Sequence, residues 1–483
     1  MNTALSDALN RIFCPRSVAV VGASSTPSKW GFRIFNRLLS SAPGAAVYPI
    51  NRTAESVLGH TTYRSLAAIP CDVDLAVIVV PENAVPGVMQ ECADKGVKAA
   101  IVITAGFKET GEEGRQLEAE VLRIARSGGV RFVGPNCNGH FNAALDLFTH
   151  GPAQVRPGPL ALISQSGNFG TYILDRGVEK KTGFSKFVSS GNEADLTVED
   201  YLEYFGEDDE TKVICAYVEG VKDGRRFIDL AKRITRSKPV VVMKSGRTAE
   251  AAQAVMSHTG SLAGSDAVHD ALFRQCGVIR VDEVDELLDV ALALVKQPLP
   301  RGRNVGIVTS GGGFGVVATD ACLRYGLRVP PLAGEIVQMM DKYLPPRWSH
   351  SNPVDMAGAT EGSYGCIGTL LKADNIDAIL AIGALGFPAD WLDRRGTALG
   401  PDSQDYVRTA IETEVRLVDG LVERIHRRQK PLIITTPIGG VKSPALEKLE
   451  DNGVFTYRTP EEGCRVISYM ARYAEYLSTV QTF

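Results

Sequence analysis

Short apolar runs rich in β-branched residues recur along the chain, and each run ends near Gly, Pro, Asn or Asp. Runs of this kind are typical of strands that are buried on both faces of a parallel sheet. In the first third of the chain they predict strands at Ser17–Gly22, Val47–Ile50, Leu75–Val80, Ala99–Thr104 and Arg131–Gly134. Helical stretches separate them, at Phe32–Ser40, Glu82–Lys95 and Glu112–Ser127. The alternation of strand and helix predicts a doubly wound α/β sheet.

The same alternation begins again twice, after the Pro- and Gly-rich stretches His150–Gly158 and Gln297–Arg303. The second series predicts strands at Leu160–Ser164, Ser185–Ser189, Lys212–Glu219, Pro239–Lys244 and Val278–Val281. The third predicts strands at Asn304–Ser310, Ala378–Gly383, Pro431–Thr436 and Val454–Tyr457. A length of 483 residues agrees with three domains of about 150 residues each. We therefore expect domains at residues 1–150, 151–300 and 301–483.

The composition argues against several classes of protein, among them nucleic-acid-binding, secreted and membrane proteins. The formal net charge is −4, without long runs of one sign, and aromatic residues make up only 7%, so we expect no nucleic-acid partner. The first ten residues lack the apolar stretch of a signal peptide, and no apolar run reaches the ~20 residues of a membrane helix. Nine cysteines are scattered without a CxxC pair, which favours a reducing compartment and no metal site. These features predict a cytoplasmic protein that does not bind membranes.

The first strand-to-helix turn has the residues of a ligand site. Ligands of open α/β sheets bind beyond the carboxyl ends of the strands. Gly22 would let a ligand approach the backbone, Ala23, Ser24 and Pro27 complete the turn, and Lys29 could meet a phosphate. The turn is not GxGxxG, because the third glycine is missing and Pro27 comes early, which argues against a standard NAD site. A structural turn without a ligand is the alternative.

Other strand ends of the first domain are similar in character. They carry small, polar or Pro residues: Asn51, Arg52, Val80, Pro81, Thr104, Gly106, Asn136 and Cys137. Together the five strand ends outline one crevice. This crevice favours a nucleotide-like ligand that is not read by the dinucleotide fingerprint.

Two later turns have the character of anion sites. Ser166, Gly167 and Asn168 follow the first strand of the second domain, and Gly311, Gly312 and Gly313 follow that of the third. A helix that starts there points unpaired N–H groups and its positive dipole end at an anion. Two such turns suggest that two helix ends converge on one anion. A Ser N-cap without a ligand is the alternative for the first turn.

Between these turns, His258 lies in a small, polar segment, Met256–Gly264. An imidazole near helix N-termini is suited to act as a nucleophile toward phosphorus, with a carboxylate on Nδ1 to fix its tautomer. Glu219, at the end of a predicted strand, is placed to be that carboxylate. The alternatives are an exposed or structural histidine and a surface glutamate.

Taken in order, these motifs resemble the α subunit of ADP-forming (NDP-forming) acyl-CoA synthetases, relatives of succinyl-CoA synthetase. The resemblance covers nearly the whole chain. It is carried by the Gly22–Pro27 turn with Lys29, by Gly134–Cys137, Ser164–Gly167, Glu219, His258–Gly264 and Asn352–Asp355. The His-Thr-Gly-Ser-Leu-Ala-Gly segment is the most specific of them.

The resemblance implies a Rossmann-like CoA-binding domain followed by two flavodoxin-like ligase domains. It implies that the protein makes acyl-CoA, ADP and phosphate from a small carboxylic acid, CoA and ATP, through an acyl phosphate. His258 would be transiently phosphorylated and Glu219 would orient it. Asn136 and Cys137 would line the thiol end of the CoA crevice.

The resemblance also implies a partner. The chain contains no ATP-grasp region, so ATP or ADP with Mg²⁺ would bind to a separate ATP-grasp β subunit in an αβ hetero-oligomer. Two positions depart from the family pattern: Thr309–Gly313 replaces the usual Thr-Asn-Ala-Gly-Gly, and Asn138 stands where an apolar residue or proline is usual. The alternatives are a non-catalytic CoA-binding regulatory protein and a nicotinamide-dependent oxidoreductase. The sequence does not identify the acid.

Overall fold

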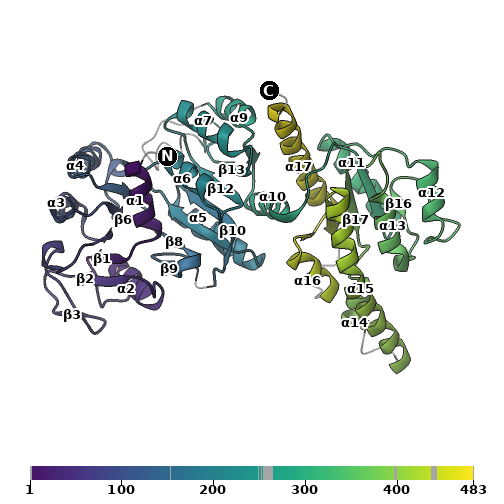
Figure 1. Ribbon diagram of the computed structural model, residues 1–483, viewed down its shortest axis with the longest axis horizontal. Coiled ribbons are helices and arrows are strands. Elements are labelled where there is room, and N and C mark those ends of the chain that lie inside the picture. The colour runs from purple at the N-terminus through teal and green to yellow at the C-terminus, as the bar shows by residue number, and fades with distance from the viewer. Residues whose placement is uncertain are drawn as a thin grey trace. The chain divides into compact units, whose positions relative to one another are not determined.

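Figure 1 shows the computed structural model of the chain, which describes residues 3–152, 154–248, 250–251, 253, 265–395, 400–436 and 443–481. The chain divides into two compact units, Met1–Leu287 and Leu288–Phe483. Within the described ranges, none of the helices combines the length and apolar character that crossing a membrane requires.

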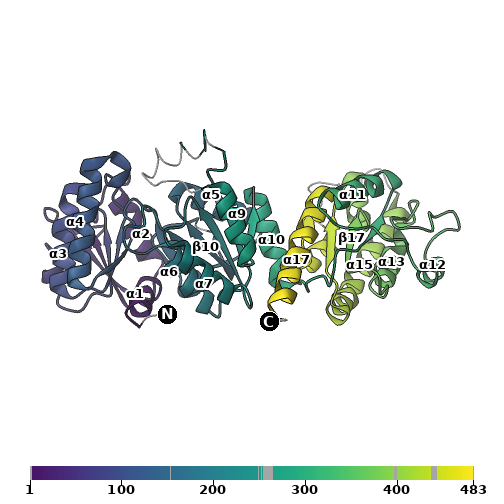
Figure 2. The ribbon, with the colours of Figure 1, turned by 90° about the horizontal axis from the view of Figure 1, so that it is seen from above.

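The first sheet has five parallel strands in the order β2-β1-β5-β6-β7. The elements of this part are α1 (Thr3–Phe13), β1 (Ser17–Val21), α2 (Trp30–Ser40), β2 (Ala46–Ile50), β3 (Ser56–Val57), β4 (His60–Thr61), β5 (Leu75–Ile78), α3 (Val85–Lys95), β6 (Ala99–Val102), α4 (Glu112–Gly128) and β7 (Arg131–Val133). Successive residues of β1 enter two cores: Val18 and Val20 face one, and Ala19 and Val21 face the other, which includes α3 and α4 residues. Figure 2 shows α3 and α4 on the opposite side of this sheet from α2. Burial on both faces explains why the strands are continuously apolar.

The second sheet, also in the first unit, has seven strands in the order β14-β13-β12-β10-β11-β8-β9. Its elements are β8 (Gly139–Asn142), β9 (Leu147–Phe148), β10 (Pro157–Ser164), α5 (Gly167–Glu179), β11 (Phe184–Ser189), α6 (Val198–Glu207), β12 (Val213–Val218), α7 (Gly224–Ile234), β13 (Val240–Lys244), α9 (Asp266–Gln275) and β14 (Ile279–Val281), followed by α10 (Val284–Lys296). The strands from β14 to β11 are parallel, and β8 and β9 add an antiparallel hairpin at the β11 edge. One apolar core joins residues of both sheets, including Val20 of β1 and Ile163 of β10.

The second unit contains a five-stranded parallel sheet in the order β16-β15-β17-β18-β19. Its elements are β15 (Val305–Thr309), α11 (Gly312–Arg324), α12 (Gly334–Met340), β16 (Val354–Asp355), α13 (Ser363–Leu370), β17 (Ala378–Ile382), α14 (Phe387–Arg395), α15 (Pro401–Arg428), β18 (Leu432–Thr435), α16 (Pro444–Asp451), β19 (Thr456–Tyr457) and α17 (Pro460–Gln481). In Figure 2, α11 and α17 lie on one side of this sheet and α13 and α15 on the other.

The predicted α/β fold class is confirmed, and every predicted strand is present. The domain limits at residues 150 and 300 remain predictions. Strands β8 and β9 precede residue 150 and pair with the second sheet, because β8 hydrogen-bonds antiparallel to β11. The amphipathic helix α1 was not predicted, although Leu5, Leu9 and Ile12 recur at helical spacing and are buried.

Candidate active site

The strand-end turns of the first sheet lie side by side and are tied together by hydrogen bonds. Gly22 N–H donates to Ile50 O at 3.0 Å, and Asn51 Nδ2 donates to Ala23 O at 2.8 Å. Thr104 Oγ1 donates to Val80 O at 2.7 Å, and Asn136 N–H donates to Thr104 O at 2.9 Å. The structure therefore brings the five predicted turns into one row, which includes the switch between β1 and β5, where ligands of such sheets bind.

Two glycines allow the first turn to form. Gly22 has a φ of +97°, and a Cβ there would overlap the carbonyl of Val79. A Cβ on Gly31, in the first turn of α2, would overlap the carbonyl of Gly22. Gly31 therefore permits the close helix–strand packing that the third glycine provides in GxGxxG. The sequence pattern missed it because it comes nine residues after Gly22.

Some side chains around the first turn stabilise the turn itself, and others are exposed and could contact a ligand. Ala23 is buried, and Ser24 Oγ accepts a hydrogen bond from Thr26 N–H at 3.1 Å. Asn51 Oδ1 accepts from Thr53 N–H and Ala54 N–H, so its side chain shapes the turns. The side chains of Pro27 and Lys29 are exposed at the rim of the turn.

The remaining residues predicted to line this crevice differ in exposure and in the hydrogen bonds that they already make. Arg52 pairs with Glu91 at 3.3 Å and stays 70% exposed, so it keeps access to solvent. Pro81 is exposed at the start of a 3-10 turn, and Gly106 N–H donates to Glu109 Oε1 at 2.7 Å. Cys137 is 3% exposed, its Sγ lies 3.3 Å from Val102 O, and burial raises its pKa to about 12. Its thiol therefore packs inside the domain and does not line the crevice.

Helix α5 begins beside the last of these turns. Ser166 is its N-cap and accepts from Phe169 N–H at 3.4 Å, while Asn168 is exposed in the first turn. Asn138, one residue after Cys137, donates from Nδ2 to Asn168 Oδ1 at 3.2 Å. A Cβ on Gly167 would lie 2.6 Å from Asn138 Nδ2. The turn predicted for the thiol end of CoA thus contacts the helix end predicted to bind phosphate, and the departure at Asn138 lies at the contact.

Glu219 follows β12 directly and is 8% exposed. Gln165, in the turn before α5, accepts hydrogen bonds at Oε1 from the N–H groups of Glu219 and Gly220 and donates from Nε2 to Gly220 O at 2.9 Å. The Gln165 amide therefore ties the Glu219 backbone to the turn before α5. His258 lies outside the described residues, so its pairing with Glu219 remains a prediction.

In the second unit, Gly311 is the N-cap of α11, and Thr309 Oγ1 donates to Gly311 O at 2.9 Å. Gly312 and Gly313 form the first helical turn. A Cβ on Gly312 would lie 3.0 Å from Asp355 Oδ2, so a carboxylate stands beside this helix end. The convergence of α5 and α11 on one anion remains a prediction.

Sequence reasoning missed the loop of residues 190–194, which we call the bridge loop. Asn192 N–H donates to Pro135 O at 2.9 Å, and Ala194 N–H donates to Gly134 O at 2.9 Å. Asn192 Nδ2 also donates to Glu109 Oε2 at 2.6 Å. The bridge loop therefore joins the end of β11 to the last of the five strand-end turns of the first sheet, which we call the CoA turns because they were predicted to bind CoA. A Gly and an acid directly after a predicted strand are the signal that could have revealed it.

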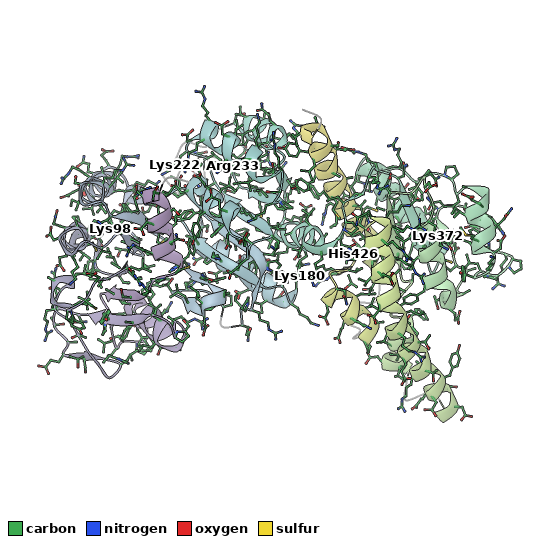
Figure 3. The ribbon with its side chains drawn as sticks, viewed as in Figure 1. Lys98, Lys180, Lys222, Arg233, Lys372 and His426 are labelled. Carbon is green, nitrogen blue, oxygen red and sulfur yellow. The ribbon has the colours of Figure 1, made fainter. Side chains whose placement is uncertain are left out.

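Charged side chains lie at the carboxyl ends of the strands of the second sheet, and two of them, Glu193 and Lys244, are buried. Glu193 is 1% exposed, and burial raises its pKa to about 7. Lys244, which ends β13 next to β12, is 3% exposed, and burial lowers its pKa. Lys222, labelled in Figure 3, donates from Nζ to the backbone oxygen of Glu193. Perturbed pKa values in such a cluster are typical of functional sites.

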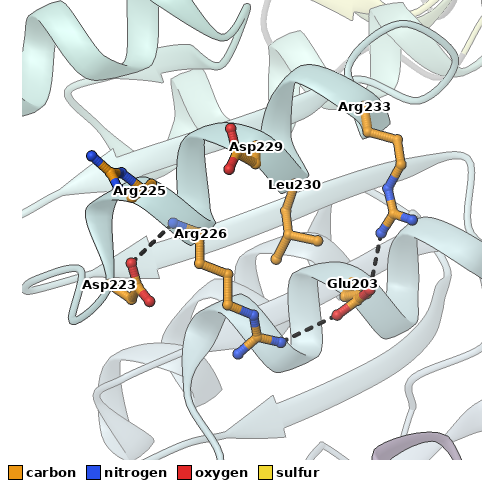
Figure 4. A pocket seen from close by; sticks show the side chains of 7 residues that line it. All are labelled: Glu203, Asp223, Arg225, Arg226, Asp229, Leu230 and Arg233. Atoms are coloured by element: carbon orange, nitrogen blue, oxygen red, sulfur yellow. Dashed lines mark hydrogen bonds and ion pairs between the residues drawn. The ribbon is translucent and has the colours of Figure 1, made fainter. Parts of the chain in front are cut away.

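A pocket of about 510 Å³ lies on the α6–α7 surface (Figure 4). Two of its three arginines already have a carboxylate partner, because Arg226 lies 3.2 Å from Glu203 and Arg233 lies 3.0 Å from the same carboxylate. It is thus a weaker candidate for an anion site than the α5 end.

Comparisons with known proteins agree with this geometry. Residues 16–143 match the CoA binding domain family, residues 157–294 the succinyl-CoA ligase like flavodoxin domain, and residues 305–381 the Ligase-CoA domain. Together with the fold, these matches define a CoA-dependent ligase.

Whole-chain relatives are more specific. The chain is 39% identical to the α subunit of acetate–CoA ligase [ADP-forming] II of Pyrococcus furiosus, over 94% of this chain and 95% of that one. It is 34% identical to the 4-hydroxybutyrate–CoA ligase [ADP-forming] of Nitrosopumilus maritimus, covering 97% of this chain and 64% of that longer one. The structure resembles the dinucleotide forming acetyl-coenzyme A synthetase 1 of Ca. Korarchaeum cryptofilum in complex with phosphate and ADP, with a TM-score of 0.84, 35% identity and 99% coverage of both chains. The chain belongs to the α subunits of the ADP-forming acyl-CoA synthetases, which are acid–thiol ligases.

Proposed function

We propose that this chain carries out the acyl-transfer half of the synthetase reaction at the contact between the CoA turns and the N-terminus of α5. The observation that carries the proposal is the Asn138–Asn168 hydrogen bond at 3.2 Å, which joins a turn of the CoA domain to a helix end suited to phosphate. The CoA thiol and a phosphate bound at α5 would meet there.

In the direction of acyl-CoA breakdown, a phosphate oxygen attacks the acyl carbon, the C–S bond breaks, and CoA leaves as the thiolate. The resulting acyl phosphate passes its phosphoryl group to Nε2 of His258, and the P–O bond breaks to release the carboxylate. The N–H groups at Gly167 and Asn168 stabilise the phosphate charge in both steps. Glu219, held through its backbone by Gln165, accepts the Nδ1–H of His258 and fixes its tautomer.

The second half of the reaction needs a partner. Relatives named as α subunits imply a β subunit, which we propose to be an ATP-grasp chain that binds ADP or ATP with Mg²⁺. His258 would carry the phosphoryl group to it within an αβ hetero-oligomer in the cytoplasm. The acid is a small carboxylic acid, with acetate the first to test because the relatives are named for it.

The first test is phosphorylation of the purified chain by phosphate and acetyl-CoA, followed by intact mass measurement and peptide mapping. We expect acid-labile phosphate on His258 and none in His258→Asn. His426→Asn changes an exposed histidine of α15 (Figure 3) and should phosphorylate normally. CoA binding without phosphorylation of the wild type, in the presence of the β subunit as well, would contradict the proposal and favour a regulatory protein.

A second test concerns the CoA crevice. Lys29→Ala should raise the Kd of CoA about 5- to 10-fold, as expected for loss of about 1 kcal/mol from an exposed phosphate contact. Lys98→Ala is the matched control, since exposed Lys98 precedes β6 and so lies at the opposite edge of the same sheet. Equal Kd values for the two variants would remove Lys29 from the site.

A further inference from the structure

The side chain of Glu193, in the bridge loop, is held in an unusual way. It is 1% exposed, and its residue has a φ of +54°, a left-handed conformation that is costly for a residue with a Cβ. Its Oε1 accepts a hydrogen bond from Ser190 Oγ at 2.7 Å, whereas Oε2 has no hydrogen-bond partner in the described part of the chain. A strained, buried carboxyl with an unpartnered oxygen is a feature that folding alone does not favour.

Gln165 connects this carboxyl to Glu219. Gln165 follows Ser164, whose carbonyl accepts a hydrogen bond from Ser190 N–H of the bridge loop at 2.8 Å, and the Gln165 side chain lowers the pKa of Glu193. Its Oε1 accepts from two backbone N–H groups, of Glu219 and Gly220, and its Nε2 donates to Gly220 O at 2.9 Å. An amide NH2 group carries two hydrogens, so the second remains available for a carboxylate.

The groups around Glu193 bring its pKa into the neutral range. Burial raises its pKa to about 7, and Glu199 on α6 adds to the rise. Lys222, after β12, and the side chains of Ser190 and Gln165 act in the opposite direction and lower this pKa. Lys108 and the buried Tyr201 of α6 also face the carboxyl. Near neutral pH the carboxyl therefore changes between an acceptor-only carboxylate and an acid that also donates a hydrogen bond.

We propose that Glu193 is a positioning residue of the phosphoryl-transfer site: its carboxylate holds the Gln165 amide, which fixes the Glu219–Gly220 backbone, and protonation of Glu193 releases that hold. The inference rests on the proposed function in assigning Glu219 to the site. A protonated Glu193 competes with the N–H groups of Glu219 and Gly220 for Gln165 Oε1, which loosens the residue that orients His258. The bridge loop also places Glu193 next to the turn at residues 134–135, because Asn192 N–H donates to Pro135 O and Ala194 N–H donates to Gly134 O.

The activity test is the pH profile of phosphorylation by acetyl-CoA and phosphate between about pH 5.5 and 8.5. Inorganic phosphate titrates in this range for every variant, so the comparison between variants carries the result. Glu193→Gln should phosphorylate slowly at all pH values. The wild-type rate should be higher at alkaline pH and should fall towards acid pH with an apparent pKa near 7, more steeply than the rate of Glu193→Gln. Ser190→Ala removes a hydrogen bond to the carboxylate and should shift the fall to higher pH. A Glu193→Gln rate that is reduced by the same factor at every pH would show a merely structural role and overturn the proposal.

Hydrogen exchange gives a readout that does not depend on activity. At pH 8, the peptide that contains Gly220 should exchange about ten times faster in Glu193→Gln than in wild type, and at pH 6 the two should agree. Glu414→Gln is the matched control, since Glu414 is a buried carboxyl of α15 whose pKa burial also raises to about 7, and it should not alter this peptide. Equal exchange of wild type and Glu193→Gln at both pH values would overturn the proposal, whether or not His258 is phosphorylated. Loss of phosphorylation with the exchange pattern intact would overturn only the proposed function.

Discussion

The contact between the bridge loop and the CoA turns can be tested with one methyl group. Gly191 has a φ of +59°, and a Cβ on it would lie 2.5 Å from Asn136 O and closer still to Pro135 O. Both obstacles are backbone atoms, so a side-chain rotation cannot relieve the overlap. Gly191→Ala must therefore move the bridge loop away from the turn at residues 134–136.

The cost has two parts. An alanine in the left-handed region costs about 1–2 kcal/mol, and forcing a methyl group into a filled space typically adds about 1–3 kcal/mol. Gly96→Ala isolates the first part, because Gly96 has a φ of +81° and a Cβ there meets nothing within 4 Å. We expect Gly191→Ala to be less stable than Gly96→Ala by about 1–3 kcal/mol.

The assay is calorimetry of the thermal transition of the first unit, which contains both glycines. At roughly 2–4 °C per kcal/mol for a unit of this size, the Tm of Gly191→Ala should lie about 2–12 °C below that of Gly96→Ala. CoA titration should also show weaker binding for Gly191→Ala alone. Equal Tm values and equal CoA affinities for the two variants would refute the packing argument.

Three further outcomes follow from contacts in the two units. Gly31→Ala should raise the Kd of CoA at least ~10-fold in a calorimetric titration, because its methyl group displaces the Gly22 carbonyl. Gly87→Ala is the control and should leave this Kd unchanged, because a Cβ on Gly87 of α3 points into open space. Lys186→Met should lower the stability of the first unit by ~3–5 kcal/mol, because the Lys186 side chain is 5% exposed and its Nζ lies 2.9 Å from Asp208 and 2.8 Å from Glu210. The measurement is the Tm, and a loss under ~1 kcal/mol, as for a surface pair, would contradict this. Folded Glu414 has a pKa of about 7 against an ordinary 4.5, so the folded state binds more protons and the stability of the second unit falls as pH rises from about 4.5 to 7. Glu414→Gln should remove up to ~3 kcal/mol of that fall, seen as a smaller difference between the Tm at pH 5 and at pH 8, and an unchanged difference would contradict the assignment.

Most of the strands, the fold class and the family could be predicted from the sequence, although β3, β4, β8, β9 and β16 were not. Strands such as β1 and β10 are buried on both faces, so their apolar runs are long enough to recognise without knowledge of the neighbours. The turns at Gly22, Ser166 and Gly311 were also recognisable, because local chemistry at the end of a strand specifies a helix start or a close backbone approach. These features depend on residues that are adjacent in the chain.

Only the tertiary structure decided which of these turns contact one another. Gly31 replaces a missing glycine because α2 crosses the Gly22 turn, and Cys137 directs its thiol inward to Val102 O. The hydrogen bonds of Asn192 to the turn at residues 134–135 and of Gln165 to the Glu219–Gly220 backbone join residues from different strands. Hydrogen bonds between residues far apart in the sequence depend on the order of the strands in the sheet and on burial. The pattern of apolar and polar residues along the chain does not specify either of these.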